Sequence, residues 1–152
     1  MNKTKKIAIG SDHGGFELKN EVINYLQEIG WIYKDFGAYD TKPTHYPDYA
    51  LRVGKAVIDG EYQCGILICG TGIGMSIAAN KIKGIRASLC HDTFSAQMAK
   101  EHNDANVLTM GGRVIGKGLA REIVRVWLMA KFSQESRHII RLQKVVDIYE
   151  PC

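Results

Sequence analysis

The amino-acid sequence predicts an α/β protein in three layers, an αβα sandwich around a parallel sheet of five strands. Short apolar runs alternate along the chain with longer amphipathic segments, which is the pattern of strands connected by helices. The run over residues 64–69 is apolar almost throughout, as expected for a strand that helices cover on both faces. Strands connected in this way lie parallel, and five of them favour a doubly wound sheet with the order 2-1-3-4-5.

The N-terminal elements are clearly marked. Residues 6–11 predict the first strand. Residues 16–29 predict a helix because apolar side chains recur on one face, and Gly30 follows where a C-terminal cap is expected. Residues 31–36 predict the second strand, and residues 37–45 form a polar loop.

The alternation continues to the end of the chain. Pro47 fits the first turn of a helix that runs to about residue 59, and the strand at 64–69 follows. The remaining expected elements are strands at 85–89 and 106–110 and helices at 73–81, 93–103, 118–132 and 135–149. There are no repeats and no linker, so residues 1–152 are expected to form a single domain.

Composition and charge limit the classes of protein to which this chain can belong. A hydrophobic content of 45% and a charged content of 24% are those of a globular protein. The net charge of +4 is mild and no block of like charges occurs, so we expect no nucleic-acid partner. No apolar run approaches the roughly 20 residues that span a membrane. No signal-peptide core follows the basic first residues, so a cytoplasmic protein is expected.

The chain has four cysteines, at positions 64, 69, 90 and 152. They form no CxxC pair and no zinc-type grouping. In a reducing cytoplasm they are expected to be free thiols. His13, His102 and His138 lie on different predicted elements without ligand spacing, so we expect no metal site. Most of the thiols can be small buried apolar residues, and Cys69 is the one with unusual neighbours.

The chemistry is expected where the strand order reverses, between the first and third strands. Ligands of open α/β sheets bind outside the carboxyl ends of the strands at that point. The first strand ends in the sequence SDHGG (11–15) and the third in CGTGIG (69–74). Both polar, glycine-rich turns therefore fall at the predicted crevice.

The turn over residues 70–74 matches neither GxGxxG nor the phosphate loop GxxxxGK[ST]. Its glycines allow an anion to approach backbone N–H groups at a helix N-terminus, but they also suit tight packing, and spacing alone does not decide between the two. Cys69 precedes this N-terminus, an environment that favours a thiolate, which can act as a nucleophile or a base. A buried core cysteine is the simpler alternative.

A second polar group is predicted far from the crevice. His102 and Asn103 end a helix, and Arg137 and Arg141 lie one turn apart on the last helix. The arginines can form a solvated basic face or an anion clamp. Because the helices of βαβ units run back to the opposite end of the sheet, these residues are expected far from Cys69 of their own chain. A site that uses both groups needs a second subunit.

These residues together resemble the ribose-5-phosphate isomerase B family, which includes galactose-6-phosphate and allose-6-phosphate isomerases. The matching segments cover essentially the whole chain in order: GSDHGGFELK (10–19), HYPDYA (45–50), GILICGTGIGMSIAANKIKGIRA (65–87), EHNDANVL (101–108), GGRV (111–114) and RHIIR (137–141). The resemblance implies a Rossmann-like homodimer, in some members paired into tetramers, with active sites shared between subunits. It also implies interconversion of ribose 5-phosphate and ribulose 5-phosphate through an enediolate, in the pentose phosphate pathway, without a cofactor or metal.

The resemblance also implies roles for single residues. Cys69 looks like the base that moves a proton between C1 and C2 of the sugar. His102 resembles the residue that opens the furanose ring, and Thr71 is expected to help move protons. Substrate binding is implied for Asp12 and Asn103 at the sugar hydroxyls, for Tyr46, for the backbone of Gly70, Gly72, Ile73 and Gly74 at the enediolate oxygens, and for His13, Arg113, Arg137 and Arg141 at the phosphate.

One position distinguishes two branches of the family. Some members have a glutamate base where this chain has Met75 and lack a cysteine at the position of Cys69, so this chain resembles the cysteine branch. Three alternatives stay open. The substrate can be a six-carbon sugar phosphate such as allose 6-phosphate or galactose 6-phosphate, since one extra carbon changes pocket depth and not the motifs. The fold also suits a non-catalytic nucleotide- or flavin-binding module. A thiol redox protein is disfavoured because no second cysteine lies nearby in sequence.

Overall fold

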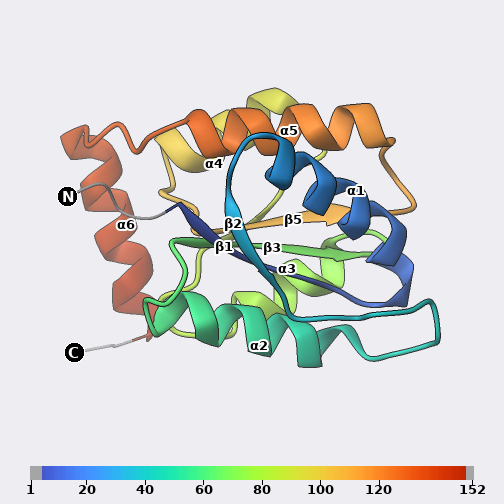
Figure 1. Cartoon of the computed structure of the whole chain (residues 1–152). Helices are drawn as coiled ribbons and strands as arrows, with labels where there is room; N and C mark the ends of the chain where they lie inside the picture. Colours follow the sequence, from blue (N-terminus) through green and yellow to red (C-terminus); the bar gives the residue numbers. More distant parts are fainter. Residues whose placement is uncertain (1–4, 150–152) are drawn as a thin grey trace.

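A computed structural model of the chain describes residues 5–149 and shows a parallel sheet between layers of helices (Figure 1). The strands are β1 (Lys6–Ser11), β2 (Ile32–Asp35), β3 (Cys64–Cys69), β4 (Ala87–Leu89) and β5 (Val107–Gly111). The helices are a 3-10 turn, η1 (His13–Gly15), and α1 (Phe16–Glu28), α2 (Tyr46–Ile58), α3 (Ile73–Ala79), α4 (Thr93–Glu101), α5 (Lys117–Met129) and α6 (Ser136–Tyr149). The three-layer α/β class predicted from the sequence is confirmed.

The central strand β3 explains why both faces of the sheet are covered. All six of its residues are buried, and their side chains alternate between two clusters. Ile66 and Ile68 pack with residues of α1, α4 and α5, whereas Leu67 and Cys69 pack with residues of α2 and α3. Because successive side chains of a strand point to opposite faces, a continuous apolar run requires a helix layer on each side.

The predicted order of the last two strands is wrong: the sheet runs β2-β1-β3-β5-β4, not 2-1-3-4-5. β5 is buried at every position and pairs with β3 on one side and β4 on the other. β4 has only three residues, none of them buried, and polar Arg86 precedes it. A short, partly polar strand is suited to the sheet edge, whereas the longer, mainly apolar strand takes the interior position. The reversal of strand order between β1 and β3 is unaffected.

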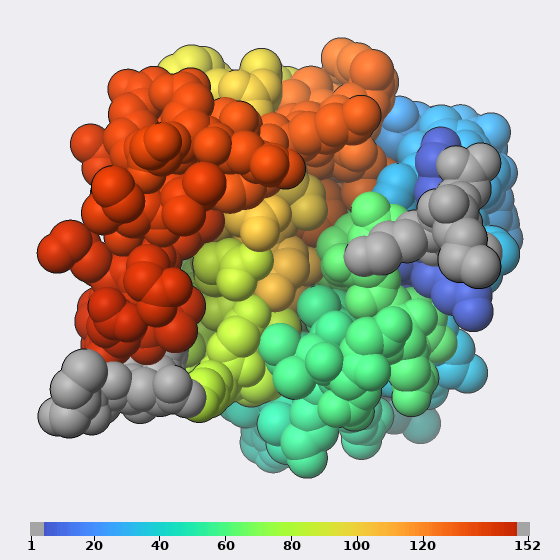
Figure 2. All heavy atoms as spheres, turned by 90° about the vertical axis from the view of Figure 1, so that its left-hand side faces the viewer, coloured from blue at the N-terminus to red at the C-terminus, as the bar shows by residue number. Residues whose placement is uncertain are grey.

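Helix α6 lies apart from the two helix layers, across the end of the sheet at which the strands begin (Figure 1). The polypeptide reaches this end because α5 runs back from the carboxyl end of β5. Figure 2 looks onto α6 and shows a hollow between it and the body of the protein. This hollow, of about 310 Å³, lies between Leu142 and Val145 of α6 and the segment that joins α3 to β4.

Cys64, Cys69 and Cys90 are buried free thiols, as expected, whereas Cys152 lies outside the described residues. Within residues 5–149, no helix combines the length and the apolar character needed to cross a membrane. In the same range, no three His, Cys, Asp or Glu side chains come together in a way that would hold a metal ion.

Candidate active site

Three turns meet where β1, β3 and β5 end. The backbone N–H of Asp12 donates to the carbonyl of Ile68 at 3.2 Å, and that of Arg113 donates to the carbonyl of Gly70 at 3.0 Å. A Cβ atom on Gly14 would lie only 3.1 Å from the backbone nitrogen of Gly70, so a side chain there would push the first two turns apart. The sequence motifs after the first and third strands therefore lie side by side, as predicted, and the turn after β5 joins them; we call the place where these three turns meet the crevice.

Cys69 ends β3 and is 4% exposed. Its Sγ atom accepts a hydrogen bond from the backbone N–H of Gly72 at 3.1 Å. In the same turn, the Oγ1 atom of Thr71 accepts from the N–H of Ile73 at 3.3 Å. Two backbone donors that the family resemblance assigns to enediolate oxygens thus bind protein atoms in this structure.

Asp12 and His13 lie at the end of β1 and are held by backbone donors. The Oδ1 atom of Asp12 caps η1 by accepting from the N–H of Gly15 at 3.1 Å. The Nδ1 atom of His13 accepts from the backbone N–H of Thr44 at 3.1 Å. An imidazole nitrogen that accepts carries no proton, so the ring proton of His13 is on Nε2 and is available to an anion.

Arg113 and Tyr46 bound the crevice. A Cβ atom on Gly70 would lie 3.1 Å from a guanidinium nitrogen of Arg113, and one on Gly14 would lie 3.4 Å from the other. The ring of Tyr46 lies over Gly74, where a Cβ atom would come within 2.7 Å of it. The glycines of both turns therefore leave room for a cation and an aromatic ring.

The second predicted group surrounds a different cavity, of about 220 Å³. It is lined by His102, Asn103, His138, Arg141, Leu142 and Val145. Arg137 points elsewhere: its Nε atom donates to a carboxylate oxygen of Glu135 at 2.7 Å. Both members of this ion pair are more than half exposed, so the pair is weak and the arginine is accessible to an anion.

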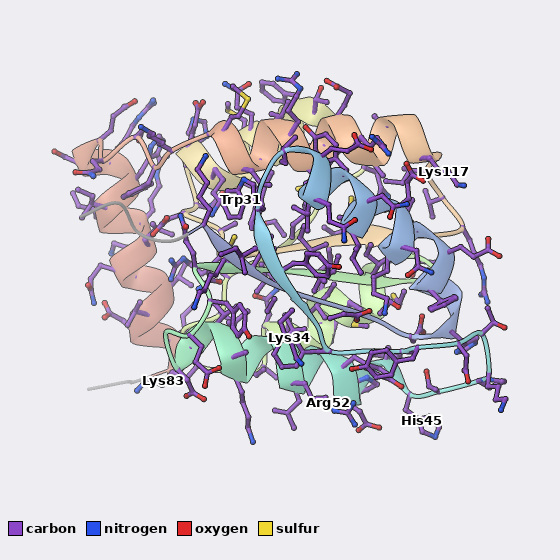
Figure 3. The ribbon with its side chains drawn as sticks, in the orientation of Figure 1. Trp31, Lys34, His45, Arg52, Lys83 and Lys117 are labelled. Carbon is purple, nitrogen blue, oxygen red and sulfur yellow. The ribbon has the colours of Figure 1, made fainter. Side chains whose placement is uncertain are left out.

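The two groups lie at opposite ends of the sheet. In Figure 3, His45 and Lys117 mark the end at which the strands finish, and Lys83 marks the end that α6 covers. Cys69 is the last residue of β3, whereas His102 follows the last residue of α4, a helix that returns to the start of the sheet. The structure therefore unites the residues around Cys69 with one another but does not bring His102, Asn103, Arg137 or Arg141 to them.

Lys19 is a residue of this region that the sequence did not single out. It is fully buried, and its Nζ atom binds both carboxylate oxygens of Asp35 at 2.8 Å and the carbonyl of Ala38. Asp35 also accepts from the N–H of Gly37 at 2.9 Å. This network anchors the start of the loop whose later residue Thr44 binds His13. The available signal was a lysine one turn before the apolar position of Val22.

His91 is a second such residue. It follows β4, and its Nε2 atom accepts from the backbone N–H of Gly111 at 3.0 Å. Gly111 packs against Thr71, since a Cβ atom there would lie 2.8 Å from the carbonyl of Thr71. His91 therefore supports the turn over residues 70–74 through Gly111. A histidine directly after a predicted strand end was the signal for it.

Known proteins are similar to this chain in sequence and in fold. The model of the ribose/galactose isomerase family matches residues 7–145. Ribose-5-phosphate isomerase B of Escherichia coli is 49% identical over 144 residues, which are 95% of this chain and 96% of that protein. D-erythrulose-4-phosphate isomerase of Pectobacterium atrosepticum is 51% identical over 128 residues, 83% of this chain and 84% of that protein.

A solved structure of ribose-5-phosphate isomerase B from Clostridium thermocellum has a TM-score of 0.94 against this chain at 49% identity, covering 95% of this chain and 97% of that one. The likeness therefore extends from the sequence to the whole described fold. Together with the polar crevice at the ends of β1, β3 and β5, these matches show that the chain belongs to the ribose/galactose isomerase family.

Proposed function

We propose that this protein interconverts ribose 5-phosphate and ribulose 5-phosphate. The observation that carries the proposal is the position of the Cys69 thiol. It lies at the crevice and accepts a hydrogen bond from the backbone N–H of Gly72. Its support from comparisons is that the relatives from Escherichia coli and Clostridium thermocellum are named for ribose 5-phosphate. The Pectobacterium atrosepticum relative is named for a four-carbon sugar phosphate at a similar identity, so the size of the sugar is a matter for direct measurement.

The chemistry follows from what an aldose–ketose exchange needs. Cys69 takes the proton from C2 of the open-chain aldose, and the electrons of that bond form an enediolate with C1. Return of this proton to C1, with the hydroxyl proton of O2 passing to O1, gives the C2 ketone and the C1 hydroxyl of the ketose. The reaction needs a base, charge stabilisation at oxygen and exclusion of water. Cys69 supplies the base, the glycine turn supplies backbone donors, and no step requires a metal or cofactor.

The phosphate is assigned to residues from both ends of the sheet. Arg113 and the Nε2–H of His13 lie at the crevice of one chain, and the guanidinium groups of Arg137 and Arg141 suit phosphate oxygens. Since α6 lies at the far end of its own sheet, the arginines of α6 reach this site from a second subunit. His102 and Asn103 accompany them and act on the sugar ring and its hydroxyls.

A homodimer is supported by the surface of α6. Ile139 is 48% exposed, Ile140 57% and Val146 44%, although all three are large apolar side chains. Apolar residues grouped on one helix mark interaction surfaces more often than isolated ones do. The exposed apolar residues of α6 therefore support a homodimer with shared active sites. As further parts of the same proposal, the protein acts in the cytoplasm and in the pentose phosphate pathway.

The test is conversion of ribose 5-phosphate by the pure protein in excess chelator, with Cys69→Ala measured beside it. Turnover that survives the chelator and is lost in Cys69→Ala supports a metal-independent isomerase with a thiol base. If the intact protein leaves ribose 5-phosphate unchanged, D-erythrulose 4-phosphate, allose 6-phosphate and galactose 6-phosphate are assayed next. Activity on one of these reassigns the sugar, and inactivity on all of them rejects the isomerase.

A further inference from the structure

His102 is stacked against a second histidine of the same chain. The ring centroids of His102 and His138 are 4.3 Å apart, with 36° between the ring planes. His102 caps the C-terminus of α4, whereas His138 lies in the first turns of α6 and is only 3% exposed. A buried ring pressed on one face of a partly exposed ring restricts how the exposed ring can turn.

Ser133 fixes the position of His138 from the other side. Its Oγ atom lies 2.7 Å from Nδ1 of His138. Its backbone N–H donates to the carbonyl of Glu101 at 3.0 Å, directly before His102. Ser133, in the segment between α5 and α6, thereby binds the end of α4 through its backbone and His138 through its side chain. The two histidines are held by one compact set of contacts.

The surroundings of His138 oppose a positive charge on it. Burial is the largest cause that lowers the pKa of His138, and the neighbouring charges of His102, Arg137 and Arg141 lower it further, against the opposite effect of Glu135. Two protonated imidazoles at this separation would repel each other. His138 therefore presents an uncharged face to His102.

We propose that His138 is a positioning residue for His102, holding the His102 ring in the orientation that opens the sugar ring. The proposal rests on the proposed function, in which His102 opens the furanose form of ribose 5-phosphate. Opening moves the proton of the anomeric hydroxyl to the ring oxygen while the bond between C1 and O4 breaks and the C1 carbonyl forms. An imidazole that relays this proton must face both oxygens, so its orientation sets the rate.

The two substrates of the reaction separate ring opening from proton transfer at carbon. Ribose 5-phosphate is mainly a closed furanose. Ribulose 5-phosphate is open, because the phosphate on O5 blocks its only five-membered ring. Steady-state turnover of ribose 5-phosphate therefore includes ring opening. A single turnover of ribulose 5-phosphate with enzyme in excess, stopped by acid, measures the transfer at carbon alone.

His138→Leu is expected to lower kcat/KM for ribose 5-phosphate by about 10- to 100-fold, as for a misplaced catalytic group. The single-turnover rate with ribulose 5-phosphate is expected to stay within about twofold of the wild type. His138→Phe retains a flat, uncharged ring and is expected to recover most of the lost turnover. Ser133→Ala, which leaves both histidines in place, is expected to show the same selective loss of ribose 5-phosphate turnover, but a smaller one.

Two variants calibrate the measurements: His102→Ala should lose turnover of ribose 5-phosphate alone, and Cys69→Ala should lose both activities. Equal losses of both activities in His138→Leu would mean that His138 only supports α6 as a whole, which overturns the proposal. Unchanged turnover in His138→Leu, or no recovery in His138→Phe, overturns it as well. A wild-type protein that does not convert ribose 5-phosphate rejects the proposed function instead, and the assignment of His138 falls with it.

Discussion

The Sγ atom of Cys69 and the backbone nitrogen of Gly72 are 3.1 Å apart, and the N–H of Gly72 donates to the sulfur. This bond depends on the backbone of Gly72, whose φ angle of 78° lies in the left-handed region that favours glycine. The strand that ends in Cys69 and the helix that begins at Ile73 are thus joined by a turn that points an N–H group at the thiol. Gly72 therefore links the sequence motif, the backbone conformation of the turn and the proposed chemistry of the thiol.

Gly72→Ala is therefore expected to inactivate the enzyme. Its Cβ atom would lie 2.6 Å from Leu89 and 2.7 Å from the carbonyl carbon of Met110, so the turn must move away from both. We expect kcat to fall by about 100-fold, because the turn that holds the thiol of Cys69 is displaced from its working position. The free energy of unfolding should fall by about 1–3 kcal/mol because of the strained φ. Steady-state kinetics and urea unfolding measure the two effects.

Gly118→Ala is the matched control. Gly118 lies in α5, and a Cβ atom there meets nothing within 4 Å. Alanine in a helix is favoured over glycine, so this variant should keep its activity and gain up to about 1 kcal/mol in stability. Wild-type kcat in Gly72→Ala would show that the bond between Gly72 and Cys69 has no part in the reaction.

Mixing two inactive variants tests whether the site is shared between subunits. Cys69→Ala damages the crevice of its chain, and His102→Ala damages the group at the other end. A mixed dimer then contains one intact site and one doubly damaged site. Random exchange makes half of the dimers mixed, so about a quarter of the wild-type activity should return. The assay is turnover of ribose 5-phosphate after unfolding and refolding the variants together.

The control for this experiment pairs Cys69→Ala with Arg113→Ala. Both residues belong to the crevice of one chain, so every site of the mixed dimer carries one defect and no activity should return. Recovery in this control, or none in the first mixture under conditions that exchange subunits, would contradict the shared site.

The sequence predicted the fold class and the crevice because both depend on local patterns. The apolar run of β3 and the glycine turn after it are contiguous, and a parallel sheet brings the turns after β1 and β3 to the same edge. The order of β4 and β5 was predicted wrongly, although Arg86 and Ser88 mark the fourth strand as more polar than the mainly apolar β5. The alternation of helices and strands predicts the order of the elements along the chain. The position of a strand within the sheet depends instead on how much apolar surface that strand has to bury.

The contacts that were not predicted are long-range and polar. Lys19 and Asp35 are 16 residues apart and meet only because α1 packs beside the end of β2. The pairing of His102 with His138 needs α5 to carry the chain back to the end of α4. A helical pattern marks which face is buried but does not name the partner of a polar side chain on that face.

Lys19→Met is expected to destabilise the protein and loosen the loop that leads to Thr44. The substitution leaves the carboxylate of Asp35 and the carbonyl of Ala38 without their cation. Breaking a buried ion pair on one side costs about 3–5 kcal/mol, and the 24% exposure of Asp35 favours the lower end. KM for the sugar phosphate should rise, because His13 depends on this loop. Urea unfolding and steady-state kinetics provide both values.

The double variant Lys19→Met/Asp35→Asn separates the lost charge pair from lost packing. Removal of the uncompensated carboxylate should restore part of the stability, since the remaining groups are neutral. Glu122→Gln is a surface control, because its partner Arg125 is exposed as well and such pairs contribute little. Equal stability of the wild type and Lys19→Met would mean that the buried network is energetically neutral.

The buried thiols predict a loss of stability at alkaline pH. Burial raises the pKa of Cys64 to about 11, against an opposing effect of Lys100. Burial, together with the charge of Asp92, likewise raises the pKa of Cys90 to about 11. The unfolded chain loses these protons near pH 8.5–9, whereas the folded chain keeps them to about pH 11. Since the folded state binds more protons in this window, its stability is full below pH 8.5 and falls as the pH rises to 11.

Each thiol should contribute a slope of up to about 1.4 kcal/mol per pH unit in the free energy of unfolding. Two other groups with shifted pKa values affect the same range: burial raises the pKa of Tyr25, which adds to the fall, and lowers the pKa of Lys100, which opposes it. Both groups remain in the double variant Cys64→Ala/Cys90→Ala, so the difference between the two proteins reports the thiols together with the interaction of Cys64 and Lys100. Urea unfolding at intervals from pH 8 to 11 should show a steeper fall for the wild type, and parallel curves would contradict thiols that stay protonated in the fold.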